Sequence, residues 1–414
     1  MINFRKFKLS NGLRVIYHKD KSSPVAAFNM LYDVGAKDEN PNMTGFAHLF
    51  EHLMFGGSSN IPDFDGPLQL AGGQSNAFTS NDITNYYMTL PSVNLESAFW
   101  LESDRLNLLA FNENSLEIQR KVVIEEFKQR YLNQPYGDIW LLLRPLCYKN
   151  HPYKWATIGE KIEHIEDAKI EDVQAFFYKH YTPRNSILSI TADLEFEKIQ
   201  ELSEKWFSSI EDRSMYARDL NKEPLQLQKR ELWVERNVPN DAIYIAFHMD
   251  DRMGSDYHVA DLISDILSRG KSARFYQKLI KDNPKFIELS AFIIGSLDNG
   301  LFVVAGKPVK GISLETAYEL IRAELDLFVT NNVEERELQK NKNKIKSSLT
   351  FQEISSLNKA MSLGYYELFD NADSINNEFI KYREINSLDI KRVAEKLFAE
   401  KNSNILFYKA KNDA

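Results

Sequence analysis

The order of the predicted elements occurs twice along this chain of 414 residues, and this repetition restricts the fold more than any other feature. In each half, the apolar periodicity predicts strands, a helix, a hairpin, further helices and a closing strand. Between the halves, residues 212–228 lose this periodicity and are rich in charged and polar side chains, which predicts a linker. We therefore expect an α+β protein of two homologous domains, residues 1–215 and 216–414, each a mostly antiparallel sheet with helices packed on it.

The expected elements follow from local patterns, and the duplication is inferred from their order rather than from residue identity. Strands of the first half are expected at residues 6–18 (a hairpin turning at Asn11 and Gly12), 26–34, 74–79, 84–90 and 187–191. Its helices are expected from Thr44 as N-cap and at residues 95–109, 115–131, 136–147, 170–180 and 195–207. The second half is expected to contain strands at 231–235, 242–248 and 405–408, a hairpin across 298–300, and helices at 256–267, from 273, 314, 334 and 353, and at 389–398.

Composition excludes several classes of protein. Apolar residues make up 43% of the chain, so it can bury real cores and is not intrinsically disordered. The net charge of -8 disfavours nucleic acid and anionic membranes as partners. No stretch reaches 18 apolar residues, so we expect no membrane span. One cysteine, Cys147, and no apolar signal segment lead us to expect a cytoplasmic protein, or a periplasmic one if a leader has been removed.

The segment with the clearest chemistry is an H-x-x-E-H pattern formed by His48, Glu51 and His52. It lies on the helix expected after Thr44, where histidines four residues apart share one face and can bind one metal ion. The alternative is an ordinary surface or core pair of histidines. With only 8 histidines in the chain, such a pattern seldom arises by chance. We therefore expect a metal site here, and H-x-x-E-H is a signature of zinc peptidases.

Around this motif the sequence resembles the pitrilysin/insulinase (M16) family of zinc peptidases, in particular its half-length, two-domain members akin to subunits of the mitochondrial processing peptidase. The resemblance covers nearly all of the first half by residues and the second half by architecture. Besides the motif, it rests on residues 32–39, 76–79, 84, 86, 151–153, 158–159 and 181–185.

The resemblance implies a third zinc ligand some seventy residues after His52, within a hydrophobic helix. Glu126, at the end of the run from Val122, matches that position. Its neighbour Glu125 is easily confused with it, but successive helical residues point about 100° apart, so both cannot face one metal. The family mechanism is amide hydrolysis at zinc with Glu51 as general base. The alternative for Glu51 is a carboxylate that orients one of the histidines.

The resemblance also implies a substrate strand. Asn76 and Ala77 are expected on an exposed edge strand to which an extended peptide adds, although an ordinary hairpin strand would have the same sequence pattern. The family often has a glutamate seven residues before the third ligand, where this chain has Gln119. An amide can still donate and accept hydrogen bonds, but it cannot raise ligand basicity as a carboxylate does.

The second half departs from the pattern of an active domain. His258 and Leu262 stand where two histidines would be needed, so no metal is expected there. Lys281 and Glu288 stand where active members have an Arg and a Tyr that bind the substrate carbonyl and the oxyanion. We expect a catalytic subunit that binds zinc and peptide and obtains the Arg/Tyr pair from a homologous partner. The alternatives are a homodimeric peptidase and a non-catalytic scaffold or peptide-binding subunit.

Overall fold

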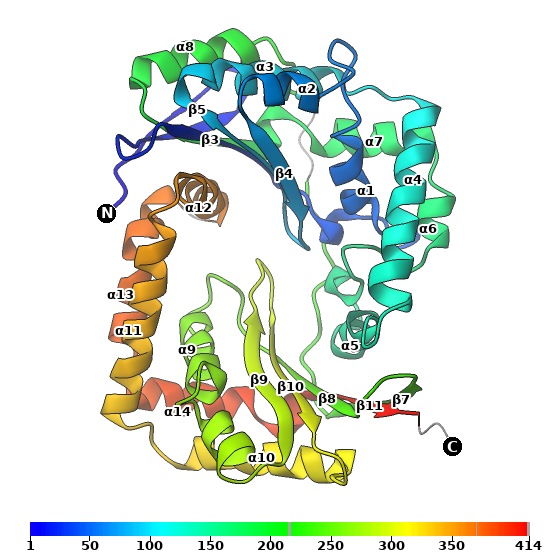
Figure 1. The fold of residues 1–414 in the computed structure, drawn as a ribbon, viewed down its shortest axis with the longest axis vertical. Helices are drawn as coiled ribbons and strands as arrows, with labels where there is room; N and C mark the ends of the chain where they lie inside the picture. The colour runs from blue at the N-terminus through cyan, green and yellow to red at the C-terminus, as the bar shows by residue number, and fades with distance from the viewer. Residues whose placement is uncertain (214–216, 370, 412–414) are drawn as a thin grey trace. The chain divides into compact units, whose positions relative to one another are not determined.

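The computed structural model describes residues 1–213, 217–369 and 371–411, and the chain forms two compact units (Figure 1). The first unit consists of Met1–Gln129, Trp155–Asn221 and Leu349–Asn377; the second consists of Arg130–Lys154, Lys222–Ser348 and Glu378–Ala414. This division differs from the expected boundary between residues 215 and 216, because two internal segments belong to the unit formed mainly by the other half of the chain. Each segment contributes a helix that packs on that unit's sheet.

The first unit is built on a six-stranded sheet in the order β1-β2-β6-β3-β5-β4. Its strands are β1 (Arg5–Lys8), β2 (Arg14–Lys19), β3 (Val25–Tyr32), β4 (Gln74–Thr79), β5 (Thr84–Pro91) and β6 (Ser186–Ala192). Only the β2–β6 pair is parallel. Strand β6 is buried along its whole length, as expected for a strand at the centre of a sheet covered on both faces. Strand β4 lies at the edge of the sheet.

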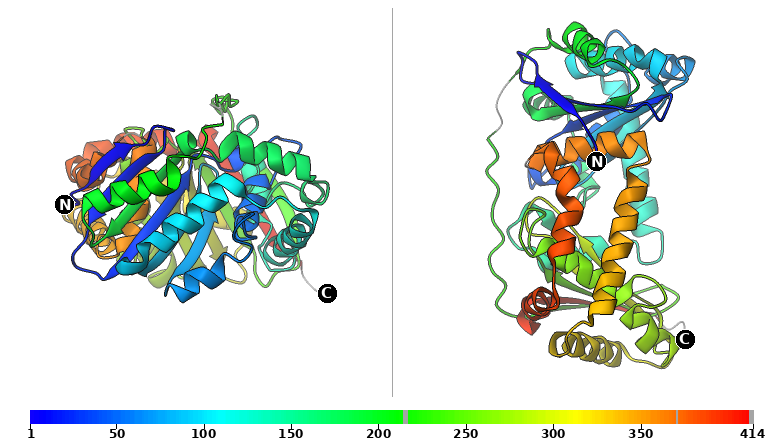
Figure 2. Two further views of the ribbon diagram at one scale, coloured as in Figure 1. Left: turned by 90° about the horizontal axis from the view of Figure 1, so that it is seen from above. Right: turned by 90° about the vertical axis from the view of Figure 1, so that its left-hand side faces the viewer.

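Helices cover both faces of this sheet. Figure 1 shows α3 and α8 on one face and α12 on the other, and Figure 2 shows α3 and α8 running side by side. Asp20 binds Lys359 of α12 at 2.7 Å, and both side chains are nearly buried. The helices of this unit are α1 (Phe46–Leu53), α2 (Asp65–Leu70), α3 (Leu95–Leu108), α4 (Glu113–Phe127), α6 (Glu163–Glu166), α7 (Ile170–His180), α8 (Phe196–Phe207) and α12 (Ser356–Phe369).

The second unit repeats the same topology in a five-stranded sheet of order β7-β11-β8-β10-β9. Strands β7 and β11 pair in parallel, as β2 and β6 do in the first unit, and the other pairs are antiparallel. The strands are β7 (Arg230–Arg236), β8 (Ala242–His248), β9 (Phe286–Ile294), β10 (Leu301–Pro308) and β11 (Ser403–Ala410). The equivalent of the edge strand β4 is therefore β9. This shared topology confirms the expected fold class of two similar, mostly antiparallel sheets with helices packed on them.

One helix from the first half of the sequence completes the core of the second unit. Ile139, Leu143 and Cys147 of α5 (Ile139–Cys147) pack against buried residues of β8, β10 and β11. Burial raises the pKa of the Cys147 thiol to about 12, which keeps it neutral. The other helices of the unit are α9 (Tyr257–Ser268), α10 (Leu314–Thr330), α13 (Glu378–Glu384) and α14 (Ser387–Leu397), together with most of α11 (Glu335–Gln352).

Most predicted elements lie within a few residues of the observed ones, and the exceptions are short. The helix expected from residue 273 is the π-helical turn η6 (Tyr276–Lys281). The short helices α2, α6 and α13 were not predicted, because four to seven residues are too few to give a clear period of 3.6. None of the helices in the described ranges is long and apolar enough to cross a membrane.

Candidate metal centre

Helix α1 carries the H-x-x-E-H motif, and its first turn is held by a buried carboxylate. The Glu39 side chain accepts hydrogen bonds from the backbone N–H groups of Gly45 (2.9 Å) and Ala47 (2.8 Å). Gly45 is the N-cap and has a φ of 90°, where a side chain would also meet the Ile158 carbonyl oxygen. The prediction of Thr44 as N-cap is therefore wrong, because the Thr44 hydroxyl instead contacts His164 and the backbone N–H of Glu160.

The amphipathic pattern of α1 separates its core face from its chemical face. Phe46, Leu49, Phe50 and Leu53 are buried, and the Phe50 ring stacks on aromatic rings of α7 and on Tyr181. His48, Glu51 and His52 lie on the opposite, half-buried face. Packing of the apolar face thus fixes which side of the helix presents the histidines.

Helix α4 contributes the third acidic group. Its N-cap is Asn112, whose side chain accepts a hydrogen bond from the Ser115 N–H at 2.7 Å, and the helix buries Val123 and Phe127. Glu126 lies between these two core positions and is half-buried. Glu125 is exposed, and its carboxylate accepts a hydrogen bond from Gln129 one turn later. The two neighbouring glutamates therefore have different surroundings, as the helical rotation requires.

The structure brings His48, His52 and Glu126 together. His48 Nε2 lies 3.7 Å from Glu126 Oε2, and His52 Nε2 lies 3.4 Å from the same oxygen. One candidate ligand atom from each residue lies within 4.8 Å of the others, and within the described ranges no other group of three His, Cys, Asp or Glu side chains does so. Two imidazoles and a carboxylate are the donor set of catalytic zinc sites, which leave a fourth position for water. The residues present therefore fit zinc.

Glu51 is held on the side of the site nearest strand β4. Its Oε2 accepts a hydrogen bond from the Thr79 hydroxyl at 2.6 Å, and Thr79 is the last residue of β4. Against the buried face of α1, the hydroxyls of Tyr86 and Tyr181 lie 3.3 Å apart. Burial raises the pKa of each hydroxyl above its ordinary value. Both tyrosines therefore stay neutral near the Glu51 carboxylate.

The residues expected to bind substrate lie on the edge strand. Asn76 is exposed and Ala77 is half-buried, and they pair with Tyr87 and Tyr86 of β5. The Asn76 side chain accepts a hydrogen bond from the Ala77 N–H at 2.8 Å. Gln119 lies on α4 seven residues before Glu126, so it shares the helix face of Glu126 two turns away.

The second unit has a different set of contacts at the equivalent helix, α9. His258 Nε2 lies 2.9 Å from the Glu378 carboxylate and 3.1 Å from the Arg252 guanidinium, and all three side chains are buried. Leu262, the residue that replaces a second histidine, is fully buried. The side chain beside His258 that carries a positive charge is therefore Arg252.

The two positions where an Arg and a Tyr were sought lie at the surface of the second unit. Lys281, at the end of η6, donates to Gln277 at 3.2 Å, and Glu288, on β9, binds Lys307 at 3.0 Å. The side chains of Lys281 and Glu288 are 58% and 67% exposed, so neither is held in a fixed pocket.

Two residues of the site were missed by sequence reasoning. Glu39 and Thr79 both lie in segments that resemble the family, but neither was assigned a contact. A capping acid is normally sought within the first turn of a helix, whereas Glu39 precedes the N-cap by six residues. The contact between Thr79 and Glu51 joins a strand to a helix, and no local pattern predicts it.

Comparison with known proteins agrees with this architecture. The family model described as "Insulinase (Peptidase family M16)" matches residues 14–136, and the one described as "Peptidase M16 inactive domain" matches residues 167–345. The zinc protease PqqE of Helicobacter pylori is 27% identical over 409 residues, which cover 97% of this chain and 91% of that protein. The beta subunit of the mitochondrial processing peptidase of Saccharomyces cerevisiae is 26% identical over 262 residues, 62% of this chain and 56% of that protein.

Solved structures show the same fold over the whole chain. The crystal structure of a protease from Helicobacter pylori superposes with a TM-score of 0.94 at 26% identity, covering 99% of this chain and 100% of that one. An M16 protein from Pseudomonas fluorescens, described as an inactive domain, superposes with a TM-score of 0.90 at 16% identity, covering 99% and 98%. With both M16 domain types matched in sequence and the two-unit fold matched throughout, the chain belongs to the pitrilysin/insulinase (M16) family of zinc proteases.

Proposed function

We propose that this chain is the zinc-bearing catalytic subunit of an endopeptidase that cleaves extended peptides. The observation that carries the proposal is the convergence of ligand atoms from His48, His52 and Glu126 within 4.8 Å, with Glu51 on the same helix face. A scaffold protein has no need to keep this donor set together with an adjacent carboxylate. When bound, zinc would acidify a water molecule and polarise the scissile carbonyl.

The other parts of the reaction are assigned to side chains of this protein. His48, His52 and Glu126 hold the metal, and the Glu51 carboxylate accepts a proton from the attacking water and delivers it to the leaving amine. Gln119 is proposed to support the ligand helix through its amide. It cannot add the negative charge that a glutamate at this position would add.

Strand β4 supports the proposal that the substrate is an extended peptide. It is the edge of its sheet, so a peptide can add alongside it as a further strand through backbone hydrogen bonds. Asn76 and Ala77, in the middle of β4, are then the residues nearest the peptide backbone. Because the Asn76 side chain binds the Ala77 N–H, it has to release that N–H if the N–H is to pair with the peptide.

A homologous partner chain is proposed to supply the donors that this chain lacks. Lysine lacks the planar fork of arginine, and an ionised glutamate cannot donate a hydrogen bond to an oxyanion, so Lys281 and Glu288 cannot replace an Arg/Tyr pair. The alternative is a peptide-binding subunit without activity, a role suggested by the description "inactive domain" for the model that matches residues 167–345.

Hydrolysis of an unstructured fluorogenic peptide tests the proposal. We expect the zinc-loaded chain alone to be very weakly active, and a homologous M16 chain with the Arg/Tyr pair to raise turnover by about 10²-fold or more, since one oxyanion donor is worth about 10²- to 10³-fold. Glu51→Gln should retain zinc and abolish turnover in the mixture. Robust cleavage by the isolated chain would refute the need for a partner. Bound zinc without turnover in any mixture would favour the inactive alternative.

A further inference from the structure

The contact between Thr79 and Glu51 connects the edge strand directly to the proposed general base. At 2.6 Å, the hydroxyl donates a short hydrogen bond to Glu51 Oε2, as expected when the acceptor is ionised. The two residues come from different elements, the end of β4 and the second turn of α1. A carboxylate held at one oxygen cannot rotate freely about its last torsion, so this contact restricts the orientation of Glu51.

Thr79 is itself held in place, because the turn that follows it is bound to the segment that leads into α1. The backbone N–H groups of Ala36 and Lys37 donate to the carbonyl oxygens of Ser80 (3.1 Å) and Asn81 (2.9 Å). Gly35 permits this close approach, since a Cβ atom there would lie 2.5 Å from the Asn81 backbone. The β4–β5 turn is therefore paired with residues 35–37 almost as a strand would be.

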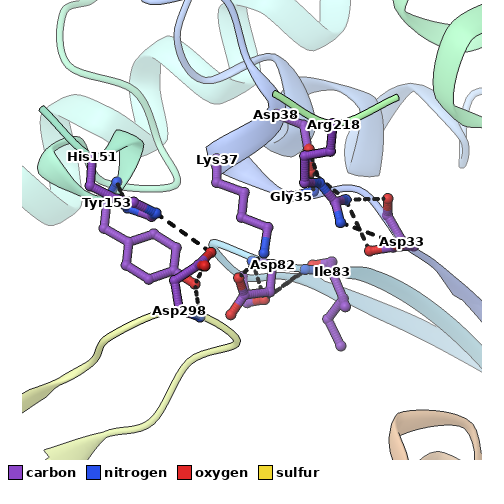
Figure 3. Close-up of polar contacts among 11 residues, drawn as sticks. Asp33, Gly35, Lys37, Asp38, Asp82, Ile83, His151, Tyr153, Arg218 and Asp298 are labelled. Atoms are coloured by element: carbon purple, nitrogen blue, oxygen red, sulfur yellow. Dashed lines mark hydrogen bonds and ion pairs between the residues drawn. The ribbon is translucent and has the colours of Figure 1, made fainter. Parts of the chain in front are cut away.

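A buried ion pair reinforces this pairing. The Lys37 ammonium lies 2.8 Å from the Asp82 carboxylate, and the two side chains are 3% and 9% exposed (Figure 3). Two residues after Lys37, Glu39 caps α1. A single short segment, residues 35–39, thus fixes both the turn that carries Thr79 and the helix that carries Glu51.

Arg218, which follows α8 in the same unit, anchors the same segment. Its guanidinium donates to the carboxylates of Asp38 (2.7 Å) and Asp33 (2.9 Å), as Figure 3 shows. The carboxylate of Asp38 in turn accepts from the Gly35 N–H at 3.0 Å. Residues 35–39 are therefore held from three sides, which makes them a rigid reference for both Thr79 and α1.

From this arrangement we infer that Thr79 is a positioning residue for Glu51, and that the pairing of residues 35–37 with the β4–β5 turn keeps the two in register. The inference rests on the proposed function, because it assigns Thr79 a role through the proposed base. Thr79 would act on the orientation of Glu51 and not on the metal, since it contacts neither histidine nor Glu126 among the contacts that the structure gives.

Isosteric and conservative substitutions separate this role from a purely structural one. Thr79→Val keeps the shape and removes the hydroxyl, whereas Thr79→Ser keeps the hydroxyl and removes a methyl group. Thr89→Val is a matched control, because Thr89 lies on the partner strand β5 opposite Gln74, at the other end of the hairpin. Zinc affinity is measured by competition with a chelator, and kcat and KM are measured with a fluorogenic peptide in the presence of the partner chain.

We expect Thr79→Val to lower kcat by about 10- to 100-fold, the loss expected for one hydrogen bond to a charged group, with KM and zinc affinity within about twofold of the parent. Thr79→Ser should restore most of kcat, and Thr89→Val should change nothing. An unchanged kcat in Thr79→Val, or an equal loss in Thr79→Ser, would overturn the inference. If Thr79→Val does not fold, Thr79→Ala is compared with Thr79→Ser by the same criteria.

A crystal structure provides a readout that does not depend on activity. In the parent and in Thr79→Ser, the Glu51 carboxylate should occupy one orientation, and in Thr79→Val it should occupy another or several. A single, unchanged orientation in Thr79→Val would overturn the inference even if the chain proves to be inactive. Conversely, normal turnover by Glu51→Gln would refute the proposed function, whatever the effect of Thr79.

Discussion

At the scale of single residues, the candidate site depends on which face of a helix each side chain occupies. His48 and His52 share a face because they are four residues apart, and Glu126 lies between two buried positions of α4. One residue earlier, Glu125 is exposed and bonded to Gln129. Adjacent glutamates with the same chemistry therefore have different surroundings, and the proposed difference in their roles can be measured.

Glu126→Gln should lose stoichiometric zinc, whereas Glu125→Gln should retain it, because only the Glu126 carboxylate faces the histidines. Both substitutions remove one negative charge from the same turn of α4, so each serves as the control for the other. Zinc content after dialysis, measured by atomic emission spectrometry, decides between them. Loss of zinc from Glu125→Gln alone would mean that the ligand assignment is wrong by one residue.

The site residues that could be predicted from the sequence are those fixed by helical periodicity or by a family motif. The spacing of His48 and His52 is local, and the resemblance to the family supplied Glu126. The contact of Thr79 with Glu51 could not be predicted in the same way, because it depends on how β4 packs against α1. Thr44 was wrongly expected to cap α1, because a threonine before a helix is usually its cap, but here a more distant carboxylate occupies that position.

At the scale of elements, the start of α1 depends on the charge state of Glu39. Burial raises the pKa of Glu39 to about 8, although the hydrogen bonds from Ala47 and Gly45 oppose this shift. The unfolded chain releases this proton near pH 4.5 and the folded chain near pH 8. Between these values the folded state holds one more proton, so the free energy of unfolding contributed by Glu39 falls as the pH rises.

Glu39→Gln removes the titrating group and should therefore remove this decrease in stability between about pH 5 and 8, at the cost of one hydrogen bond because its amide has a single acceptor oxygen for the two N–H groups. Glu39→Ala should instead destabilise the protein at every pH by about 1–3 kcal/mol for each buried N–H left without an acceptor. Urea unfolding of the parent and both variants across this pH range measures these effects. If Glu39→Gln keeps the slope of the parent, other groups must cause it.

The sequence does not predict which unit a helix packs on when that unit is formed mainly by the other half of the chain. The helices α5 and α12 were predicted as helices, and each was assigned to the domain that contains it in sequence. Their apolar faces do not identify the sheet they cover, because any sheet face offers the same kind of surface. Only the folded structure shows which sheet each helix covers. Lys359 of α12 binds Asp20 of the first unit, and Cys147 of α5 packs in the core of the second unit.

At the scale of the whole molecule, two sheets of one topology carry different chemistry. The first unit places two histidines and a glutamate together, and the equivalent helix of the second unit places His258 beside a buried guanidinium and Glu378. A positive charge already present next to His258 disfavours a metal cation there. The residues at these two equivalent helices therefore predict one metal site per chain, in the first unit.

Anomalous diffraction at the zinc absorption edge, from crystals of the zinc-loaded chain, tests this account most directly. We expect one strong peak per chain, in contact with the Nε2 atoms of His48 and His52 and with the carboxylate of Glu126, and no peak beside His258. Data collected just below the edge serve as the control, because a zinc peak should almost disappear there. A peak bound by Glu125, a peak in the second unit, or no peak between α1 and α4 would contradict the account.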